Sequence, residues 1–150
     1  MEFGLDEQRA VLRSGRSRFQ LSTLPASEFP SVDEGAAECE FTLSQTQLRH
    51  LIQRTSFSMA QQDVRYFLNG MLLEVAAEHV RTVATDGHRL AMCTVQPGAD
   101  GASRQVIVPR KGVLELARLL ADGDDPVSVS LGGNHLQAAV EGFRFTTKLV

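Results

Sequence analysis

The chain has 150 residues, of which 43% are hydrophobic, and a formal net charge of −3. This length is enough for one domain with a sizeable core plus a smaller piece, and no apolar run is long enough to span a bilayer. The acidic N-terminus lacks the basic start of a secretory signal, and the negative charge argues against non-specific coating of nucleic acid, although it leaves room for a local basic surface.

The N-terminal segment, residues 10–24, predicts a β-hairpin: a strand, a turn at Gly15 and a second strand that carries Phe19. Residues 138–149 repeat this order around Gly142. An exposed strand edge bearing a phenylalanine favours aggregation. Residues 31–37 read as a linker, so we expect a domain boundary between residues 1–30 and residues 38–150.

Residues 41–56 predict a strand followed by a helix. Ser44 with Gln47 three residues later matches a capping box, the usual start of a helix. One face of that helix has apolar or small side chains at helical spacing, namely Leu48, Leu51, Ile52 and Thr55. Three strand-like runs come next, at residues 67–75, 80–85 and 89–95. Cys39 and Cys93 lie far apart in strand-like runs, which favours free thiols over a disulfide or metal pair.

The second half of the chain repeats this order. Residues 105–108 predict a strand, and Pro109 suits the first turn of a helix that ends near Gly123. Three more strands are expected at residues 127–131, 136–140 and 143–149. Two strand–helix–three-strand units side by side can bury their apolar faces against each other, which predicts an α+β domain with two helices packed on continuous antiparallel sheet.

Asp86-Gly87 lies between two strand-like runs and predicts a two-residue hairpin turn, because glycine accepts positive φ. The blocks at residues 83–91, 61–74 and 106–112, in this order and spacing, closely resemble the bacterial DNA polymerase III beta subunit, the replicative sliding clamp. The resemblance extends over residues 3–150 and implies the DNA-clamp fold.

The resemblance also implies a domain assignment. Residues 1–30 match the final hairpin of a first clamp domain, and residues 38–150 match the middle domain without its closing segment. In this family three such domains form a subunit, and two subunits form a homodimeric ring around double-stranded DNA. The resemblance further implies a non-catalytic protein of the bacterial cytoplasm, associated with the nucleoid, without metal, organic cofactor or membrane contact.

The family's peptide-binding cleft receives short motifs of the replicative polymerase, the clamp loader and repair polymerases. The resemblance assigns to that cleft Leu68, Thr85, Gly87, His88, Arg89 and Leu90. Apolar walls with a few polar groups at the rim suit such a pocket. Considered without the family, Leu68 reads as an ordinary core leucine.

The family's DNA-facing positions match Gln62, Arg65, Tyr66 and Lys111. Arg110 and Lys111 also stand at the start of a predicted helix, where cations and free N–H groups together attract phosphate. The alternative is two solvated surface charges. Arg49 and Arg54 are weaker candidates of the same kind. Phe19 and Leu21 match apolar positions at the contact between subunits.

Two other readings compete with a clamp. One is a free-standing short clamp homologue that binds the same motifs without encircling DNA. The other is a small hydrolase in which Asp86 orients His88 as a general base. The sequence has no nucleophile elbow, no His-Glu-x-x-His and no phosphate-binding glycine loop, so catalysis is the weakest of the three.

Overall fold

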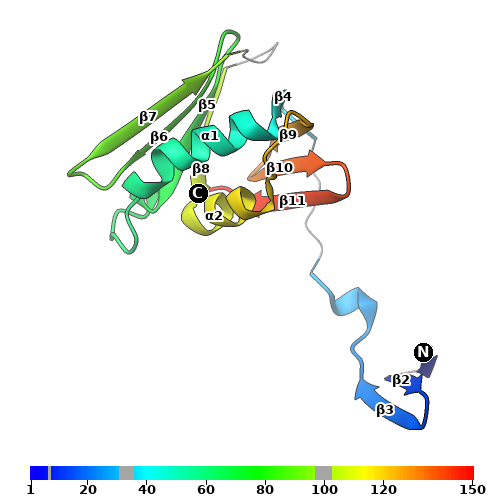
Figure 1. Ribbon diagram of the computed structural model, residues 1–150. Coiled ribbons are helices and arrows are strands. Elements are labelled where there is room, and N and C mark those ends of the chain that lie inside the picture. The colour runs from blue at the N-terminus through cyan, green and yellow to red at the C-terminus, as the bar shows by residue number, and fades with distance from the viewer. Residues whose placement is uncertain (7, 31–35, 97–102) are drawn as a thin grey trace. The chain divides into compact units, whose positions relative to one another are not determined.

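The computed structural model describes residues 1–6, 8–30, 36–96 and 103–150. These form two compact units, Met1–Glu34 and Gly35–Val150 (Figure 1). Most of the predicted linker, residues 31–35, lies outside the described residues. That the smaller unit is the end of a first clamp domain stays a prediction.

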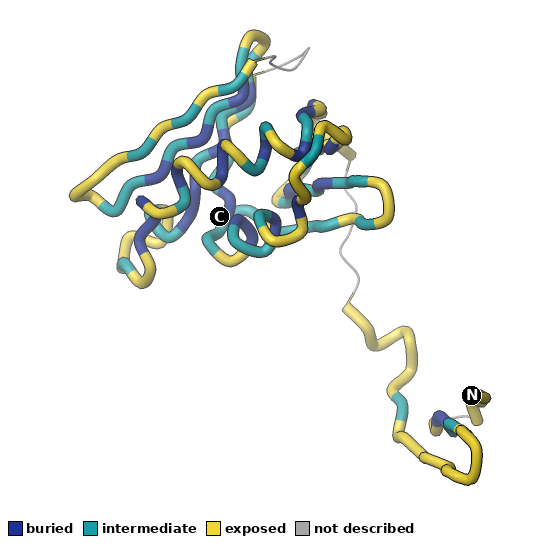
Figure 2. The backbone as a smooth tube through the Cα atoms, viewed as in Figure 1, coloured by how far each residue is buried: buried dark blue, intermediate teal, exposed yellow. Residues whose placement is uncertain are grey.

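The smaller unit is an antiparallel sheet with the strand order β1-β2-β3. The predicted hairpin is present as β2 (Arg9–Ser14) and β3 (Ser17–Ser22), with Gly15 at φ 58° in the turn. Strand β1 (Glu2–Asp6) extends it and was not predicted; a 3-10 turn, η1 (Ala26–Glu28), comes after β3. Of the described residues in this unit only Ala10 is buried (Figure 2), so the sheet leaves both faces largely exposed.

The larger unit repeats one order of elements twice, as predicted. Its first half consists of β4 (Cys39–Ser44), α1 (Gln45–Thr55), β5 (Gly70–Val75), β6 (Val80–Thr85) and β7 (Leu90–Val95), with the 3-10 turns η2 (Ser56–Ser58) and η3 (Tyr66–Leu68) between α1 and β5. Its second half consists of β8 (Arg104–Pro109), α2 (Arg110–Leu119), β9 (Pro126–Gly132), β10 (His135–Val140) and β11 (Phe143–Lys148).

The strands form two four-stranded antiparallel sheets, β7-β6-β5-β8 and β11-β10-β9-β4. Each half therefore contributes its first strand to the sheet of the other half: Leu72 of β5 pairs with Ile107 of β8, and Phe41 of β4 pairs with Val129 of β9. The Val150 N–H donates to the Ile107 carbonyl at 3.0 Å, which ties the end of one sheet to the edge of the other. This exchange of strands was not predicted, and the expected continuous sheet is instead two separate four-stranded sheets.

Helix α1 packs on β6 and β7, and α2 packs on β5, β8 and β11 (Figure 1). The capping box of α1 is formed: Ser44 Oγ accepts the Gln47 N–H at 3.1 Å, and Gln47 Oε1 accepts the Ser44 N–H at 3.0 Å. The predicted apolar face is buried, with Leu51 at 0% exposure. The buried Thr55 hydroxyl has a hydrogen-bond partner inside the core, because its Oγ1 donates to the Leu51 carbonyl at 2.8 Å.

Three predicted boundaries were wrong. Residues 67–69 are not strand, since β5 begins at Gly70, where a Cβ would lie 2.7 Å from the Val108 carbonyl oxygen. Pro109 closes β8 and precedes α2 instead of lying in its first turn. Helix α2 ends at Leu119, since Leu120 turns back into the core in extended conformation. The carbonyl of Gly123 is then free to accept the Thr46 N–H of α1 at 3.0 Å.

Within the described residues no helix is both long and apolar enough to cross a membrane. In the same part of the chain no group of three His, Cys, Asp or Glu side chains is placed to hold a metal ion. Cys39 is buried, Cys93 is half-buried, and both are free.

Candidate functional site

The predicted turn at Asp86-Gly87 is a longer loop than expected. The β6–β7 register pairs Thr85 with Leu90, so the connection has four residues, 86–89, and not two. Gly87 has a φ of +90°, a conformation that side-chain-bearing residues rarely adopt. The expected positive φ is therefore present in a wider loop, which holds polar side chains at the surface.

This 86–89 loop is held by its own side chains. Asp86 Oδ1 accepts the N–H groups of His88 and Arg89, each at 3.0 Å. Thr85 Oγ1 accepts the Gly87 N–H at 3.1 Å and donates to the Arg89 carbonyl at 2.7 Å. The backbone N–H groups of His88 and Arg89 lower the pKa of Asp86. Asp86 thus orders the backbone of its own loop.

Arg89 anchors the loop to the end of helix α1. Its Nε lies 3.2 Å from Asp86 Oδ2, and its Nη2 donates to the Phe57 carbonyl at 2.8 Å. The guanidinium also lies over the Phe57 ring, 5.8 Å from the centroid, in cation–π geometry. The loop is consequently fixed at both its start and its end.

A second loop, residues 60–69, lies between η2 and β5. The Ala60 N–H donates to the Leu68 carbonyl at 3.0 Å and closes its two ends. Inside it, Asn69 Oδ1 accepts the Asp63 N–H at 2.9 Å, and Asn69 Nδ2 donates to the Asp63 carbonyl at 2.8 Å. One asparagine therefore fixes the backbone of Asp63 on both sides.

Asp63 in turn holds Arg65. Its Oδ1 accepts the Arg65 Nε at 2.9 Å and the Arg65 backbone N–H at 2.8 Å, and its Oδ2 lies 2.8 Å from Nη2. These bonds to Arg65 lower the pKa of Asp63 to about 2. A predicted DNA-facing arginine is thus paired, through two N–H groups, with a carboxylate of its own loop.

The two loops border a shared surface hollow of about 370 Å³. Asp86, His88 and Arg89 of the 86–89 loop line one side of it. The other side is lined by Met59, Ala60, Gln61, Gln62 and Asp63. One predicted DNA-facing residue, Gln62, therefore lines the same hollow as two predicted cleft residues.

The other predicted cleft residues lie outside the lining of this hollow. Thr85 and Leu68 are half-buried, and Gly87 and Leu90 are exposed, Leu90 by 65%. Leu68 is not part of the buried core cluster, so the ordinary core reading does not describe it. Their use as a peptide cleft stays a prediction.

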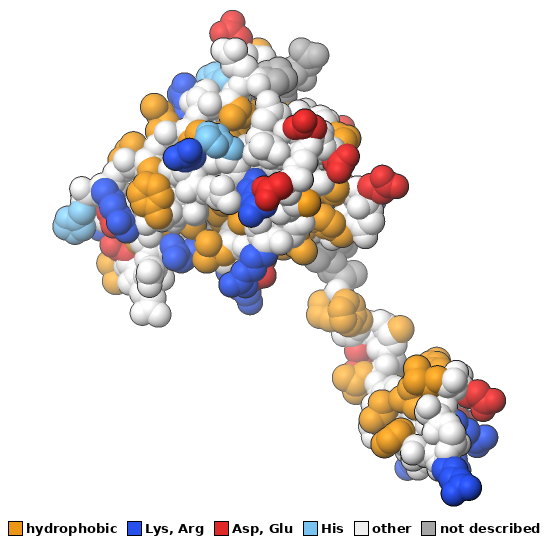
Figure 3. Space-filling model, in the orientation of Figure 1, with side chains coloured by type: hydrophobic (Ala, Val, Ile, Leu, Met, Phe, Trp, Pro, Cys, Tyr) orange, Lys and Arg blue, Asp and Glu red, His pale blue; other side chains and the backbone are white. Residues whose placement is uncertain are grey.

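The remaining predicted DNA-facing residues differ in solvent exposure and in hydrogen bonding. Tyr66 is 68% exposed and packs edge-to-face with Phe67 at 5.9 Å, and Lys111 is exposed. Arg110 is half-buried: its N–H donates to the Asn69 carbonyl at 2.9 Å, and its Nη1 lies 3.5 Å from the Met59 carbonyl. Figure 3 shows Lys and Arg side chains scattered over the visible face of the larger unit, without one large basic patch.

The two weaker arginine candidates on α1 also differ. Arg49 Nη1 forms an ion pair with Asp122 at 2.6 Å, whereas Arg54 is exposed near the end of the helix.

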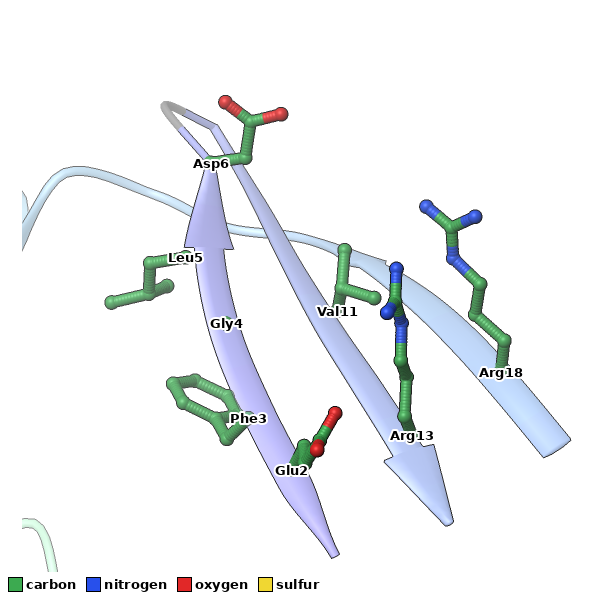
Figure 4. A pocket seen from close by; sticks show the side chains of 8 residues that line it. All are labelled: Glu2, Phe3, Gly4, Leu5, Asp6, Val11, Arg13 and Arg18. Carbon is green, nitrogen blue, oxygen red and sulfur yellow. The ribbon is translucent and has the colours of Figure 1, made fainter. Parts of the chain in front are cut away.

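In the smaller unit the β-sheet register separates an apolar face from a charged one. Phe19 pairs with Leu12 and Leu21 with Ala10, and both Phe19 and Leu21 are more than half exposed. The other face has a row in which Arg13 pairs with Arg18 and with Glu2. A shallow pocket of about 540 Å³ opens along β1 (Figure 4), lined by Glu2, Phe3, Gly4, Leu5, Asp6, Val11, Arg13 and Arg18.

Sequence reasoning did not find Asp63, Asn69 and Phe57, which position the two loops. Asn69 contacts both its own loop and Arg110 of α2, and Phe57 contacts a loop more than 30 residues later. An Asp and an Asn within a short loop are a signal for side-chain-to-backbone bonding, but the sequence does not tell which backbone groups they bind.

Comparison with known proteins places these features in a family. The family model for the DNA polymerase III beta subunit, central domain, matches residues 42–150. The chain is 57% identical to the beta sliding clamp of Escherichia coli K12 over 97% of its length, and 56% identical to that of Pseudomonas aeruginosa over 100%. It spans about 40% of the length of these relatives.

Comparison with solved structures finds the same family. A Pseudomonas aeruginosa sliding clamp with ligand matches 99% of this chain with a TM-score of 0.92 at 56% identity, and the chain covers 41% of it. A clamp from the same organism bound to griselimycin matches with a TM-score of 0.90 at 56% identity, with 99% of this chain and 40% of that one covered.

Proposed function

This chain belongs to the DNA polymerase III beta subunit family, and on that premise we propose that it acts within a sliding clamp, a processivity factor for DNA replication. In this role it makes and breaks no bond and needs no cofactor. It holds polymerases to DNA in the bacterial cytoplasm, through one surface that docks peptides and another that faces the duplex. The observation that supports the proposal most directly is the ordered 86–89 loop, exposed at the end of β6 and β7 beside the 60–69 loop.

Peptide docking fits the chemistry of the first surface. Leu90 presents an exposed apolar side chain, and Leu68 a half-buried one. His88 and Arg89, both exposed, add polar groups at the rim. An apolar floor with a few placed polar groups suits a short linear motif of the replicative polymerase, the clamp loader or a repair polymerase.

Duplex DNA is the proposed ligand of the second surface, formed by Gln62, Arg65, Tyr66, Arg110 and Lys111. Lys111 lies in the first turn of α2, whose N-cap Pro109 offers no side-chain cap. The Arg110 N–H already donates to the Asn69 carbonyl, so the proposed phosphate contact uses the Lys111 ammonium and the later N–H groups of this turn. Contacts of this kind reach phosphate and sugar, so binding is independent of sequence and weakens as salt rises.

The smaller unit supplies the proposed subunit contact. Phe19 and Leu21 form part of its exposed apolar face, which suits burial against another subunit in a homodimeric ring. The ring belongs to the full-length family; this chain carries part of its wall.

Griselimycin provides a direct test, since a related clamp is known in complex with it. We expect a titration followed by amide NMR to shift the peaks of Leu68 and residues 85–90 at micromolar to millimolar ligand, the range expected for part of a cleft. Leu90→Ala should weaken binding, whereas Leu119→Ala, which removes an exposed leucine from α2, should not. Dispersed peaks that stay unchanged at millimolar griselimycin would overturn the docking proposal.

A further inference from the structure

Arg65 lies at the junction between the two proposed surfaces. Asp63 fixes its side chain through Nε and Nη2, and the Arg65 carbonyl accepts the Leu68 N–H at 2.8 Å. Asn69 fixes Asp63 and also accepts the Arg110 N–H of α2. The position of the Arg65 guanidinium is therefore set by a chain of bonds within the proposed DNA-facing surface.

The guanidinium lies directly against the 86–89 loop. A Cβ at Gly87 would stand 3.3 Å from Arg65 Nη2, 3.5 Å from Nη1 and 3.8 Å from Cζ. These near-equal distances place the guanidinium group against the α-carbon of Gly87. Glycine is favoured there by its φ of +90°, and a Cβ would also be tightly placed against the guanidinium. Arg65 consequently supports the loop that carries the proposed cleft residues.

We propose that Arg65 is a positioning residue that couples the two surfaces: paired with Asp63 it supports the 86–89 loop, and a DNA phosphate that draws it away from Asp63 removes this support. The inference rests on the proposed function, because it concerns the same two ligands. The proposed coupling between the two ligands is negative: bound duplex DNA lowers the affinity of the chain for a docked peptide.

Competition for one guanidinium is the physical basis of this coupling. Phosphate and carboxylate both accept the paired N–H groups of arginine, so the Asp63–Arg65 pair and an Arg65–phosphate pair are alternative states. Asp63 is 22% and Arg65 52% exposed at the side chain, so a phosphate can reach the pair. By linkage, a peptide that favours the supported loop must weaken DNA binding by the same factor.

The first test needs no ligand. We expect Arg65→Gln and Asp63→Asn each to shift the amide peaks of Gly87, His88 and Arg89, with no loss of the dispersed spectrum of the core. The double variant should shift them no further than Arg65→Gln alone, since Asp63 acts on the loop through Arg65. Arg118→Gln, which removes an exposed arginine from α2, is the matched control. Additive shifts, or none at residues 86–89, would overturn the inference.

The second test measures the coupling itself, as the griselimycin affinity with and without a short DNA duplex at low salt. We expect the duplex to weaken griselimycin binding about five-fold in the wild type and to have no effect in Arg65→Gln. Arg65→Lys should also be uncoupled, since an ammonium keeps the charge but not the paired N–H groups. Coupling that persists in Arg65→Gln would contradict the proposal.

The two tests separate this inference from the proposed function. A wild type that binds neither griselimycin nor duplex overturns the proposed function, while the ligand-free spectra still decide whether Arg65 positions the loop.

Discussion

At the scale of single residues, two carboxylates define the geometry of the candidate site. The Asp86 carboxylate accepts hydrogen bonds from backbone N–H groups of its own loop, and the Asp63 carboxylate accepts hydrogen bonds from Arg65. Both pKa values are lowered, because in each case hydrogen bonds favour the charged form. Both carboxylates therefore stay charged at neutral pH, where they keep the loops in place.

The lowered pKa of Asp63 predicts how its loop responds to acid. A carboxyl group with a lower pKa in the folded state contributes stability above its ordinary pKa of 3.8, and this is lost as the pH falls toward about 2. We expect the Asp63 carboxyl carbon to titrate near 2 by NMR, and at a higher pH that is still below 3.8 in Arg65→Gln, which removes the guanidinium but keeps the backbone N–H of residue 65 as a donor. Equal midpoints in the two proteins would show that Arg65 is not the cause.

At the scale of elements, the N–H groups at the start of helix α1 are hydrogen-bonded partly by residues close in the sequence and partly by distant ones. Its capping box comes from Ser44 and Gln47, three residues apart. Its first two N–H groups, of Gln45 and Thr46, instead donate to the carbonyls of Asp125 and Gly123 in the loop after α2, both at 3.0 Å. The N-terminus of α1 is thus occupied by the protein's own acceptors at Gln45, Thr46 and Gln47, whereas at the start of α2 the Arg110 N–H donates to the Asn69 carbonyl and Pro109 adds no side-chain cap.

The capping box can be tested by Ser44→Ala. This change leaves the Gln47 N–H without its acceptor and should lower the free energy of unfolding by about 1 kcal/mol. Urea unfolding followed by circular dichroism measures the loss. Ser44→Asp, which keeps an oxygen acceptor at the cap, should recover most of it. A Ser44→Ala protein as stable as the wild type would mean that the bonds to the carbonyls of Gly123 and Asp125 alone define this helix start.

At the scale of the molecule, the two units have unequal cores. In the larger unit the exchange of β4 and β8 between the two sheets makes each half depend on the other, and strand residues such as Val75 and Val127 are completely buried. The smaller sheet buries only Ala10 among its described residues and exposes Phe3, Leu5, Phe19 and Leu21. An apolar face with free strand edges favours association with another surface.

This exposed face predicts self-association of the chain. Light scattering after size-exclusion chromatography should show a molar mass that rises with concentration, since burial of the apolar face is favourable. Replacing Phe19 and Leu21 together by serine should reduce the rise. The pair Arg18→Ser and Gln20→Ser lies on the opposite face of β3 and should have no such effect. Equal association of both double variants would place the contact elsewhere.

The sequence by itself determined most of the elements and the family. Helical spacing, the Ser44–Gln47 box and alternating strands depend on residues close in the chain, and the predicted α+β order of two strand–helix–three-strand units was confirmed. Tertiary structure alone decided the exchange of β4 and β8, the four-residue width of the 86–89 loop and the contact of Arg65 with Gly87. These depend on atoms brought together from distant parts of the chain, and local periodicity carries no information about such pairings.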